Sequence, residues 1–189
     1  MDRLDKKELR SRFLALRRAI GPEERRAADA AICRNIRSMA CYREAEHVAL
    51  YATDGTEPDL SSLLNEKGKR FYFPRYVAEG NEYELVGVEE PGSELVRAKF
   101  GLLEPRPELP AAPAGILAQM LILTPAVACD RRGVRLGRGG GFYDRMLAGE
   151  SGAVVAVVYG CQLTESLPRE PHDRPVDFAV TEKEILEFL

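Results

Sequence analysis

Apolar residues recur at helical spacing through the first part of the chain. Leu9, Phe13, Leu16 and Ile20 lie three or four positions apart, which predicts an amphipathic helix over residues 4–20. Gly21-Pro22 should end this helix, and the fixed φ of Pro22 suits it to the first turn of a second one. The second helix carries its own apolar stripe, formed by Ala28, Ile32, Ile36 and Met39. The chain therefore begins with two helices that each have one face to bury.

Beyond these helices the apolar residues gather in short runs, as is typical of buried strands. The runs cover residues 47–52, 70–73, 82–88, 119–124, 153–159 and 176–180. Pro74 should end the second run, because proline lacks the N–H that a strand interior needs. Asp59 can cap a short helix between two of the runs. Thr181 and Glu184 have the spacing of a capping box and should open a last helix.

Strands that alternate with helices predict an α/β protein. We expect a three-layer α/β/α sandwich with a mainly parallel sheet, in which residues 1–189 form a single domain. Prolines crowd the segment from Pro91 to Pro113, which predicts an irregular excursion over the surface. The chain contains no internal repeat and no low-complexity tract.

The composition narrows the class of protein without identifying it. A net charge of −3 gives no reason to expect binding to nucleic acid or to a membrane. No apolar run approaches the ~18 residues of a membrane span, and the charged amino terminus lacks the apolar stretch of a secretion signal. The four cysteines form no C-x-x-C pair, so we expect a cytoplasmic protein with reduced thiols. His47 and His172 are far apart in the sequence, and we expect both to be structural.

The strongest chemical signal is the run Arg135-Leu136-Gly137-Arg138-Gly139-Gly140-Gly141-Phe142-Tyr143-Asp144, which follows the apolar run at 119–124. Glycines without a Cβ let backbone N–H groups converge on an anion, and the amino terminus of a following helix adds a favourable field. Arg135 and Arg138 can neutralise phosphate charge, and Asp144 can hold Mg²⁺ beside it. The alternative is a flexible glycine turn with solvated arginines, in which Phe142 and Tyr143 are core aromatics.

This run is neither of the common nucleotide-binding motifs. A P-loop requires Lys-Ser or Lys-Thr after its last glycine, and no such pair follows here. Gly137 and Gly139 begin the dinucleotide pattern G-x-G-x-x-G, but Phe142 stands where the third glycine belongs. The standard signatures therefore do not support a generic nucleotide fold.

The residues from Asp130 to Asp144, with the pattern D-x-x-G-x-R-L-G-R-G-G-G-F-Y-D, resemble the signature of the 5-formyltetrahydrofolate cyclo-ligases, also called methenyltetrahydrofolate synthetases. Shorter motifs resemble the family in the same order over nearly the whole chain: Lys6-Lys7-Glu8-Leu9-Arg10, Glu57-Pro58-Asp59, Phe73-Pro74-Arg75, Phe100-Gly101-Leu102-Leu103-Glu104-Pro105 and Val176-Asp177. Matches in one order are more specific than any one of them. The resemblance implies an α/β sandwich that closes 5-formyltetrahydrofolate to 5,10-methenyltetrahydrofolate with ATP and Mg²⁺.

The resemblance also implies a role for each matched position. The amino-terminal element implies ATP contacts by Lys6, Lys7 and Arg10. The glycine-rich run implies further ATP contacts by Arg135, Leu136, Gly137, Arg138, Gly139, Gly140, Gly141, Phe142 and Tyr143. Substrate contacts would come from Arg10, Ala52, Glu57, Arg138 and Phe142, and of these Glu57 and Arg138 would be catalytic. Mg²⁺ would be held by Asp144 and Asp177.

The chain departs from the family pattern near two of these motifs. Leu60 stands where many relatives have threonine, and Pro58 occupies the middle of the Glu57-Pro58-Asp59 step. Gly140 replaces a lysine of some members, which places phosphate neutralisation on Arg138 and on the first helix.

The implied reaction requires positioning and charge neutralisation rather than a covalent nucleophile. ATP would phosphorylate the N5-formyl oxygen, N10 would attack the resulting iminium phosphate, and ADP and phosphate would be released. The absence of a Ser-His or Cys-His pairing fits this chemistry. The expected partners are two small molecules, 5-formyltetrahydrofolate and ATP, while the oligomeric state stays open.

Other interpretations of the same residues remain open. The basic first helix can be a solvated face or can touch RNA, and Glu57 and Asp59 can simply cap a helix. Asp177 lies inside the end of the apolar run at 176–180, where we expect it to be buried and where an unpaired carboxylate would be costly. Two rival functions are a non-catalytic folate- or RNA-binding protein and a sugar-phosphate isomerase or transferase. Asp144 and Asp177 favour the ATP enzyme, because a pure binder needs no pair of metal carboxylates.

Overall fold

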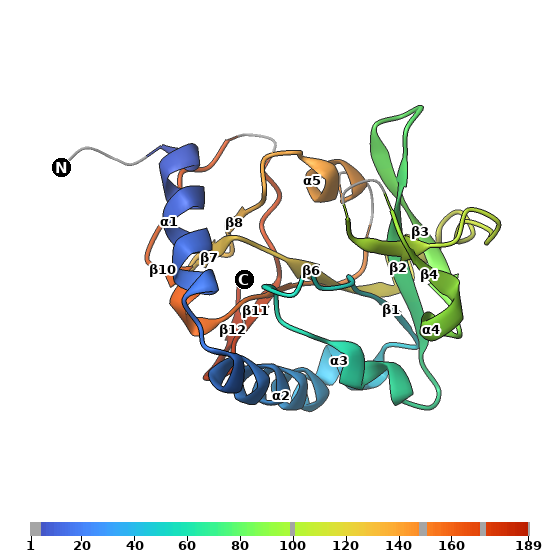
Figure 1. Ribbon diagram of the computed structural model, residues 1–189, viewed down its shortest axis with the longest axis horizontal. Coiled ribbons are helices and arrows are strands. Elements are labelled where there is room, and N and C mark those ends of the chain that lie inside the picture. The colour runs from blue at the N-terminus through green and yellow to red at the C-terminus, as the bar shows by residue number, and fades with distance from the viewer. Residues whose placement is uncertain (1–4, 99–100, 148–150, 171–172, 189) are drawn as a thin grey trace.

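The centre of the molecule is a seven-stranded mixed sheet with the strand order β12-β11-β9-β6-β1-β2-β3 (Figure 1). The computed structural model describes residues 5–98, 101–147, 151–170 and 173–188. Five neighbouring strands are parallel, namely β1 (His47–Ala49), β2 (Arg70–Val77), β6 (Met120–Pro125), β9 (Val154–Val157) and β11 (Phe178–Val180). At the two edges, β3 (Glu82–Val88) and β12 (Ile185–Glu187) pair antiparallel with β2 and β11. The predicted α/β fold with a mainly parallel sheet is confirmed.

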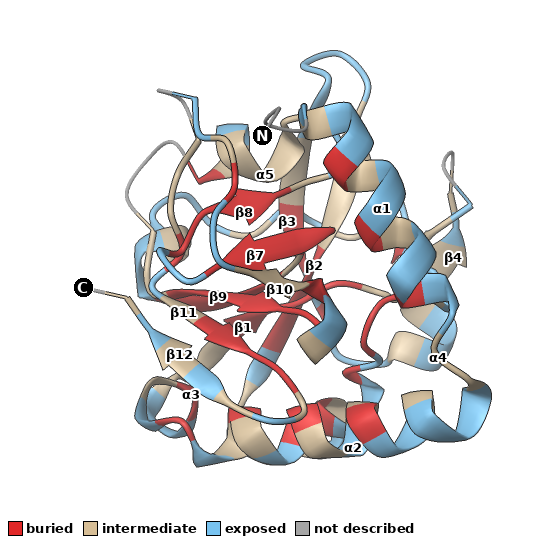
Figure 2. Ribbon diagram, turned by 90° about the vertical axis from the view of Figure 1, so that its left-hand side faces the viewer, coloured by how far each residue is buried: buried red, intermediate tan, exposed pale blue. Residues whose placement is uncertain are grey.

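Both faces of this sheet are covered (Figure 2). The helices α2 (Pro22–Ser38) and α3 (Ala40–Glu44) lie along one face, and α5 (Phe142–Met146) lies over the other. Successive strand side chains point to opposite faces, so Leu121 belongs to the same apolar cluster as Ile32 of α2, whereas Ile122 belongs to the cluster of Leu147 beyond α5. A parallel sheet that is buried on both faces explains why its strands are continuous apolar runs in the sequence.

The first helix, α1 (Lys6–Arg18), packs against a second, three-stranded sheet formed by β7 (Ala128–Asp130), β8 (Arg135–Leu136) and β10 (Leu163–Thr164). Leu9 and Phe13 of α1 form one apolar cluster with Ala128 and Leu136 of this small sheet. Asp5 opens α1 with a capping box, because its Oδ1 accepts from Glu8 N at 2.8 Å and Glu8 accepts in return from Asp5 N. The packing of α1 fixes its basic residues relative to the strand that carries Arg135.

The proline-rich segment is more ordered than the sequence predicts. It contains α4 (Pro91–Glu94) and an antiparallel pair of short strands, β4 (Leu95–Arg97) and β5 (Leu103–Pro105). Three 3-10 helices complete the described elements, η1 (Ser61–Asn65), η2 (Ile116–Gln119) and η3 (Gly160–Gln162). Asp59 accepts a hydrogen bond from Ser61 N at the start of η1, so the helix expected after Asp59 forms as a short 3-10 turn.

The prediction that Pro74 ends a strand is wrong. Strand β2 continues to Val77, and Pro74 pairs with Leu85 of β3. The backbone groups of Tyr72 and Tyr76 point to the edge of β2 that faces away from β3. Tyr72 O accepts from Leu50 N, and Tyr76 N donates to Glu104. Pro74 lies between Tyr72 and Tyr76, two positions from each, so its backbone also faces away from β3. The parallel ladder with β1 on that edge has already ended at Tyr72. The N–H that proline lacks is therefore not needed for the pairing with β3.

The predicted last helix is also wrong. Thr181 Oγ1 accepts from the N–H groups of Lys183 and Glu184, as an N-cap side chain does. The chain then turns back along β11 as the antiparallel strand β12 instead of winding into a helix. The open edge of β11 supplies backbone partners that a sequence pattern does not reveal.

Within the described part of the chain, no helix has both the length and the apolarity to cross a membrane. His47 has the structural environment that we expected, since its Nδ1 lies 3.0 Å from the hydroxyl of Tyr72 on the neighbouring strand. His172, and Phe100 of the matched motif, lie outside the described residues.

Candidate active site

The strand order sets the position of the pocket. From β1 the chain moves to β2 on one side, whereas β6, β9 and β11 follow on the other, so the order reverses between β1 and β6. In open α/β sheets, ligands bind outside the carboxyl ends of the strands at such a point. The pocket lies there, lined by Tyr51 and Ala52 after β1 and by Pro125, Ala126 and Val127 at the end of β6.

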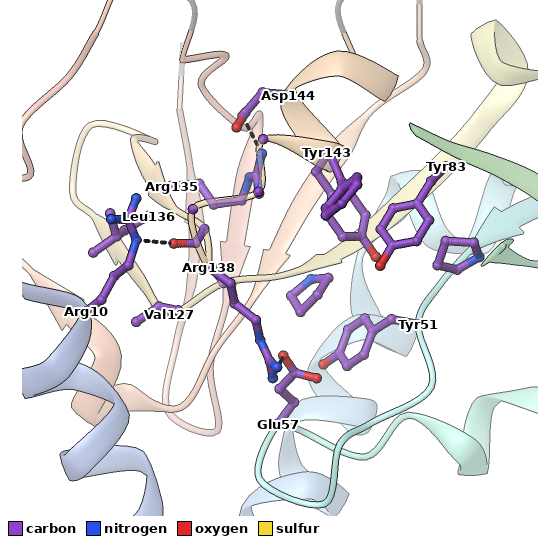
Figure 3. A pocket seen from close by; sticks show the side chains of 18 of the residues that line it. Arg10, Tyr51, Glu57, Tyr83, Val127, Arg135, Leu136, Arg138, Tyr143 and Asp144 are labelled. Carbon is purple, nitrogen blue, oxygen red and sulfur yellow. Dashed lines mark hydrogen bonds and ion pairs between the residues drawn. The ribbon is translucent and has the colours of Figure 1, made fainter. Parts of the chain in front are cut away.

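The glycine-rich run forms a second wall of this pocket, and every residue from Arg135 to Asp144 lines it (Figure 3). Pairing of β8 with β7, with Arg135 opposite Cys129, holds the start of the run. Gly139 and Gly141 have φ angles of +100° and +64°, which L side chains rarely adopt. Gly141 immediately precedes α5. These two glycines are thus required by the backbone path that the run takes around the pocket.

Helix α1 brings two basic side chains to the same pocket. Lys6 and Arg10 lie one turn apart and both line it. Arg10 Nε donates to Gly137 O at 2.8 Å, and Lys6 Nζ donates to Glu170 at 2.6 Å and to Asp173 at 2.7 Å. Burial opposes the charge on Lys6, but these hydrogen bonds outweigh it and raise the pKa of Lys6. Lys7 is exposed and is not among the lining residues, because adjacent positions point to different sides of a helix.

Arg138 joins the glycine-rich run to an acidic loop that follows β1. Its Nη2 donates to Glu57 Oε1 at 2.8 Å and also to Asp54 Oδ2. The loop is held locally, since Asp54 Oδ1 accepts from Thr56 N at 2.8 Å and from Glu57 N at 3.0 Å. Figure 3 shows the side chain of Arg138 extending from the glycine-rich run to Glu57. The predicted catalytic pair, Glu57 and Arg138, is therefore in direct contact.

The two acids of this loop have opposite pKa shifts. Glu57 is only 6% exposed, and this burial raises the pKa of its carboxyl group. The positive charges of Arg138 and Arg17 oppose the shift. Burial also opposes the charge on Asp54, but hydrogen bonds from Thr56 and Arg138 outweigh it and lower the pKa of Asp54. Glu57 is thus the stronger base of the two.

Asp144 and Asp177 lie at different ends of the parallel sheet. Asp144 lines the pocket, where its Oδ1 accepts from Arg135 Nη2 at 2.6 Å. Asp177 is exposed and precedes β11, and its Oδ2 accepts from Val154 N at the amino end of β9. The structure therefore does not bring the two carboxylates to one site, and the expectation that Asp177 is buried is wrong. Across the residues that the structure describes, no group of three or more His, Cys, Asp or Glu side chains could hold a metal ion.

An aromatic cluster forms another side of the pocket. The ring of Phe142 lies 4.7 Å from that of Tyr83 and 5.9 Å from that of Tyr76, and the guanidinium of Arg145 lies 5.0 Å from its centre. Tyr83 and Tyr143 also line the pocket, next to the tyrosine that follows β1 (Figure 3). Phe142 therefore has aromatic neighbours of its own in addition to its place in the pocket wall.

Several residues at or behind the pocket were missed by the sequence analysis. Those that line the pocket include Tyr51, Tyr83, Glu170 and Asp173, and Asp54 and Arg17 lie next to Glu57. Glu104 was recognised only as part of a motif, yet it is buried in the wall and accepts from Tyr76 N at 3.0 Å. The only local signal was helical: Arg17 lies seven positions after Arg10, on the same face of α1.

Comparisons with known proteins find similar chains over nearly the whole length of the sequence. The model of the 5-formyltetrahydrofolate cyclo-ligase family matches residues 2–182. The chain is 40% identical to a 5-formyltetrahydrofolate cyclo-ligase of Mycolicibacterium smegmatis, with 94% of each chain covered, and 33% identical to that of Escherichia coli, with 91% of this chain and 97% of the relative covered. The solved structure of Aquifex aeolicus 5,10-methenyltetrahydrofolate synthetase superposes with a TM-score of 0.84 at 37% identity, covering 96% of this chain and 92% of the other.

Proposed function

The chain belongs to the 5-formyltetrahydrofolate cyclo-ligase family, and we propose that it closes 5-formyltetrahydrofolate with ATP in the pocket beside β1 and β6. It is therefore an enzyme, a ligase that acts on a folate, as the sequence resemblance predicted. Family membership argues against both rivals, the non-catalytic binder and the sugar-phosphate enzyme. The roles of individual residues are our proposal.

The basic side chains of the pocket would bind the phosphates of ATP. Lys6 and Arg10 reach the pocket from α1, and Arg135 and Arg138 reach it from the glycine-rich run. Carboxylates line the same cavity and pair with Lys6, Arg135 and Arg138, so a polyphosphate would replace these acids as the partner of the cations. Phosphate transfer depends mainly on such positioning and charge neutralisation. Lys7, which is exposed outside this cavity, would contribute only to the surrounding potential.

Asp144 would hold Mg²⁺ together with the phosphates. Mg²⁺ prefers oxygen ligands and is commonly bound by one or two carboxylates plus substrate phosphates, so a single pocket carboxylate fits it. The hydrogen bond from Arg135 fixes one oxygen of this carboxylate. Bound there, Mg²⁺ would neutralise charge on the transferring phosphoryl group.

The reaction would proceed through a phosphorylated formyl group. The γ-phosphoryl group passes from ATP to the N5-formyl oxygen, which releases ADP and leaves an N5-iminium phosphate. N10 attacks the formyl carbon, the bond between that carbon and the phosphate oxygen breaks, and phosphate departs as the ring closes. The N10 proton must be removed, and the buried Glu57, whose pKa is raised, is the carboxylate best suited to accept it.

The folate would lie between Glu57 and the aromatic side of the pocket. Ala52 offers little bulk in the segment after β1, and Phe142 offers an aromatic face beside Tyr83. Arg10 and Arg138 would serve both ligands, because Arg10 bonds the glycine-rich run from α1 and Arg138 reaches from that run to Glu57.

The observation that carries this proposal is the contact of Arg138 with Glu57. One side chain joins the wall suited to phosphate and the carboxylate suited to the N10 proton, which is the juxtaposition that the reaction needs. Purified protein should form methenyltetrahydrofolate from 5-formyltetrahydrofolate, ATP and Mg²⁺, and the absorbance of the product measures this formation. Omission of ATP should abolish the signal. If calorimetry detects binding of both ligands but no product forms, the protein is instead a non-catalytic binding protein.

A further inference from the structure

A buried cation lies directly behind the acidic loop. Arg17, in the last turn of α1, has a side chain that is 2% exposed, and it does not line the pocket. Its Nη2 is 3.5 Å from Asp54 Oδ2 and its Nη1 is 3.6 Å from Glu57 Oε1. Arg138 contacts the same two oxygens from the pocket side. The two carboxylates therefore lie between two guanidinium groups.

The contacts of Arg17 are incomplete in a way that those of Arg138 are not. Among the described residues, neither Nε nor Nη1 of Arg17 has a hydrogen-bond partner, and the bond from Nη2 is at the long limit. Buried donors without acceptors are unfavourable. Arg138, by contrast, bonds both carboxylates closely while its side chain is 50% exposed. Arg17 thus has unpaired N–H donors beside Asp54 and Glu57, which accept their close hydrogen bonds from Arg138.

The charge balance of this cluster depends on where Arg138 points. Two carboxylates and two guanidinium groups are balanced as observed. If Arg138 turns toward a phosphate, Asp54 and Glu57 keep only one counter-ion in a poorly solvated place, where uncompensated charge is costly. The exposed Arg138 has room to turn, whereas Arg17 is enclosed.

We propose that Arg17 is a positioning residue, the buried counter-ion that holds Asp54 and Glu57 when Arg138 leaves them to bind the ligand phosphate. This inference rests on the proposed function, because it takes the phosphates of ATP as the partner of Arg138. Once Arg138 has turned, the carboxylate oxygens that it bonded become acceptors for the unused donors of Arg17. Glu57 then keeps its place for the N10 proton while Arg138 serves the phosphate.

The fold keeps Arg17 in place for this task. Arg25 Nη2 donates to Arg17 O at 3.0 Å, and Arg25 Nη1 donates to Thr56 O, so the end of α1 and the acidic loop are tied together. Burial lowers the pKa of Arg17, but a guanidinium remains charged because its ordinary pKa is so high. A lysine ammonium in the same place would lose its proton far more readily.

The test is a double-mutant cycle on MgATP binding, measured by calorimetry. Arg17→Gln should weaken MgATP binding roughly tenfold, because departure of Arg138 would leave both acids without a counter-ion. Arg18→Gln removes the same charge from an exposed position next along the helix, and it should leave binding unchanged. In an Asp54→Asn background only Glu57 needs a counter-ion, so Arg17→Gln should weaken binding by roughly threefold or less.

Melting curves check that each variant is folded at the assay temperature. If Arg17→Gln is not folded there, Arg17→Lys replaces it in the same double-mutant cycle. Equal losses in the two backgrounds, or wild-type binding by the Arg17 variant, would overturn the inference. Wild-type protein is assayed in parallel for MgATP binding and for methenyltetrahydrofolate formation. Absence of both would refute the proposed function, whereas their presence with an unaffected Arg17 variant would refute only the role of Arg17.

Discussion

The two ends of the parallel sheet differ sharply in what they gather. At the carboxyl ends of β1 and β6, basic side chains from α1 and the glycine-rich run surround a pocket that also contains Glu57 and Asp144. At the amino ends, Asp177 is exposed and accepts a hydrogen bond from Val154 N. Both Asp144 and Asp177 match family motifs, yet only Asp144 lies where ligands bind in such sheets. A motif match therefore identifies candidate residues, while strand direction decides which of them meet.

The largest expected effect tests these two aspartates directly. Asp144→Asn should lower kcat roughly a hundredfold or more, because the carboxylate that would hold Mg²⁺ beside the phosphates loses its charge. High Mg²⁺ should restore part of the rate. Asp177→Asn is the matched control and should change kcat less than threefold. It should weaken the hydrogen bond from Val154 N, which lowers the free energy of unfolding by about 1 kcal/mol. Steady-state assays at limiting and saturating Mg²⁺ with thermal melts measure both, and equal losses of activity would contradict the difference between the two ends.

Within the pocket, the aromatic side should serve the folate rather than the nucleotide. Phe142→Ala should weaken binding of 5-formyltetrahydrofolate by about 1–3 kcal/mol, by analogy with the stacking of bases on aromatic side chains, and should spare ATP. Calorimetry with each ligand separately measures this. Equal losses for both ligands would mean that Phe142 mainly supports the glycine-rich run through its contacts with Tyr83 and Arg145.

Helix α1 should affect ATP through one of its faces only. Arg10→Gln removes the cation that bonds Gly137 O and lines the pocket, and it should raise the KM for ATP roughly tenfold, as expected for a lost charge-assisted bond. Lys7→Gln removes a charge from the exposed side of the same turn and should leave the KM within twofold of wild type. A similar rise for both variants would reduce the role of α1 to its general positive potential.

The smallest expected effect concerns stability at acid pH. The pKa of Asp54 in the folded protein is below its ordinary value of 3.8, so its ionised form stabilises the fold above that pH. This contribution disappears as the pH falls below 3.8 toward the folded-state pKa. Asp54→Asn should therefore lower the melting temperature by about 2–4 °C at pH 7 and by progressively less below pH 3.8. Melting curves across this range are the measurement, and a constant difference would argue against the ion pairs as its source.

The sequence by itself determined the two amino-terminal helices, the parallel strands of the central sheet and the chemical character of the site. The helical spacing of Leu9 and Phe13, and Pro22 in the first turn of α2, gave two helices, since such patterns act within one or two turns of backbone. Apolar runs predicted strands buried on both faces. The resemblance carried by the glycine-rich run identified the family and one complete wall of the pocket.

Only the tertiary structure decided which segments meet. Pro74 continues a strand because the ladder on its side has already ended, and the capping turn at Thr181 leads into β12 because β11 has an open edge. Asp177 lies away from Asp144 because it precedes a parallel strand, whereas the pocket follows the ends of β1 and β6. Arg17, in the first helix, reaches Glu57 after the first strand only through the packing of α1. Contacts between distant segments depend on strand order and packing, which residue spacing does not encode.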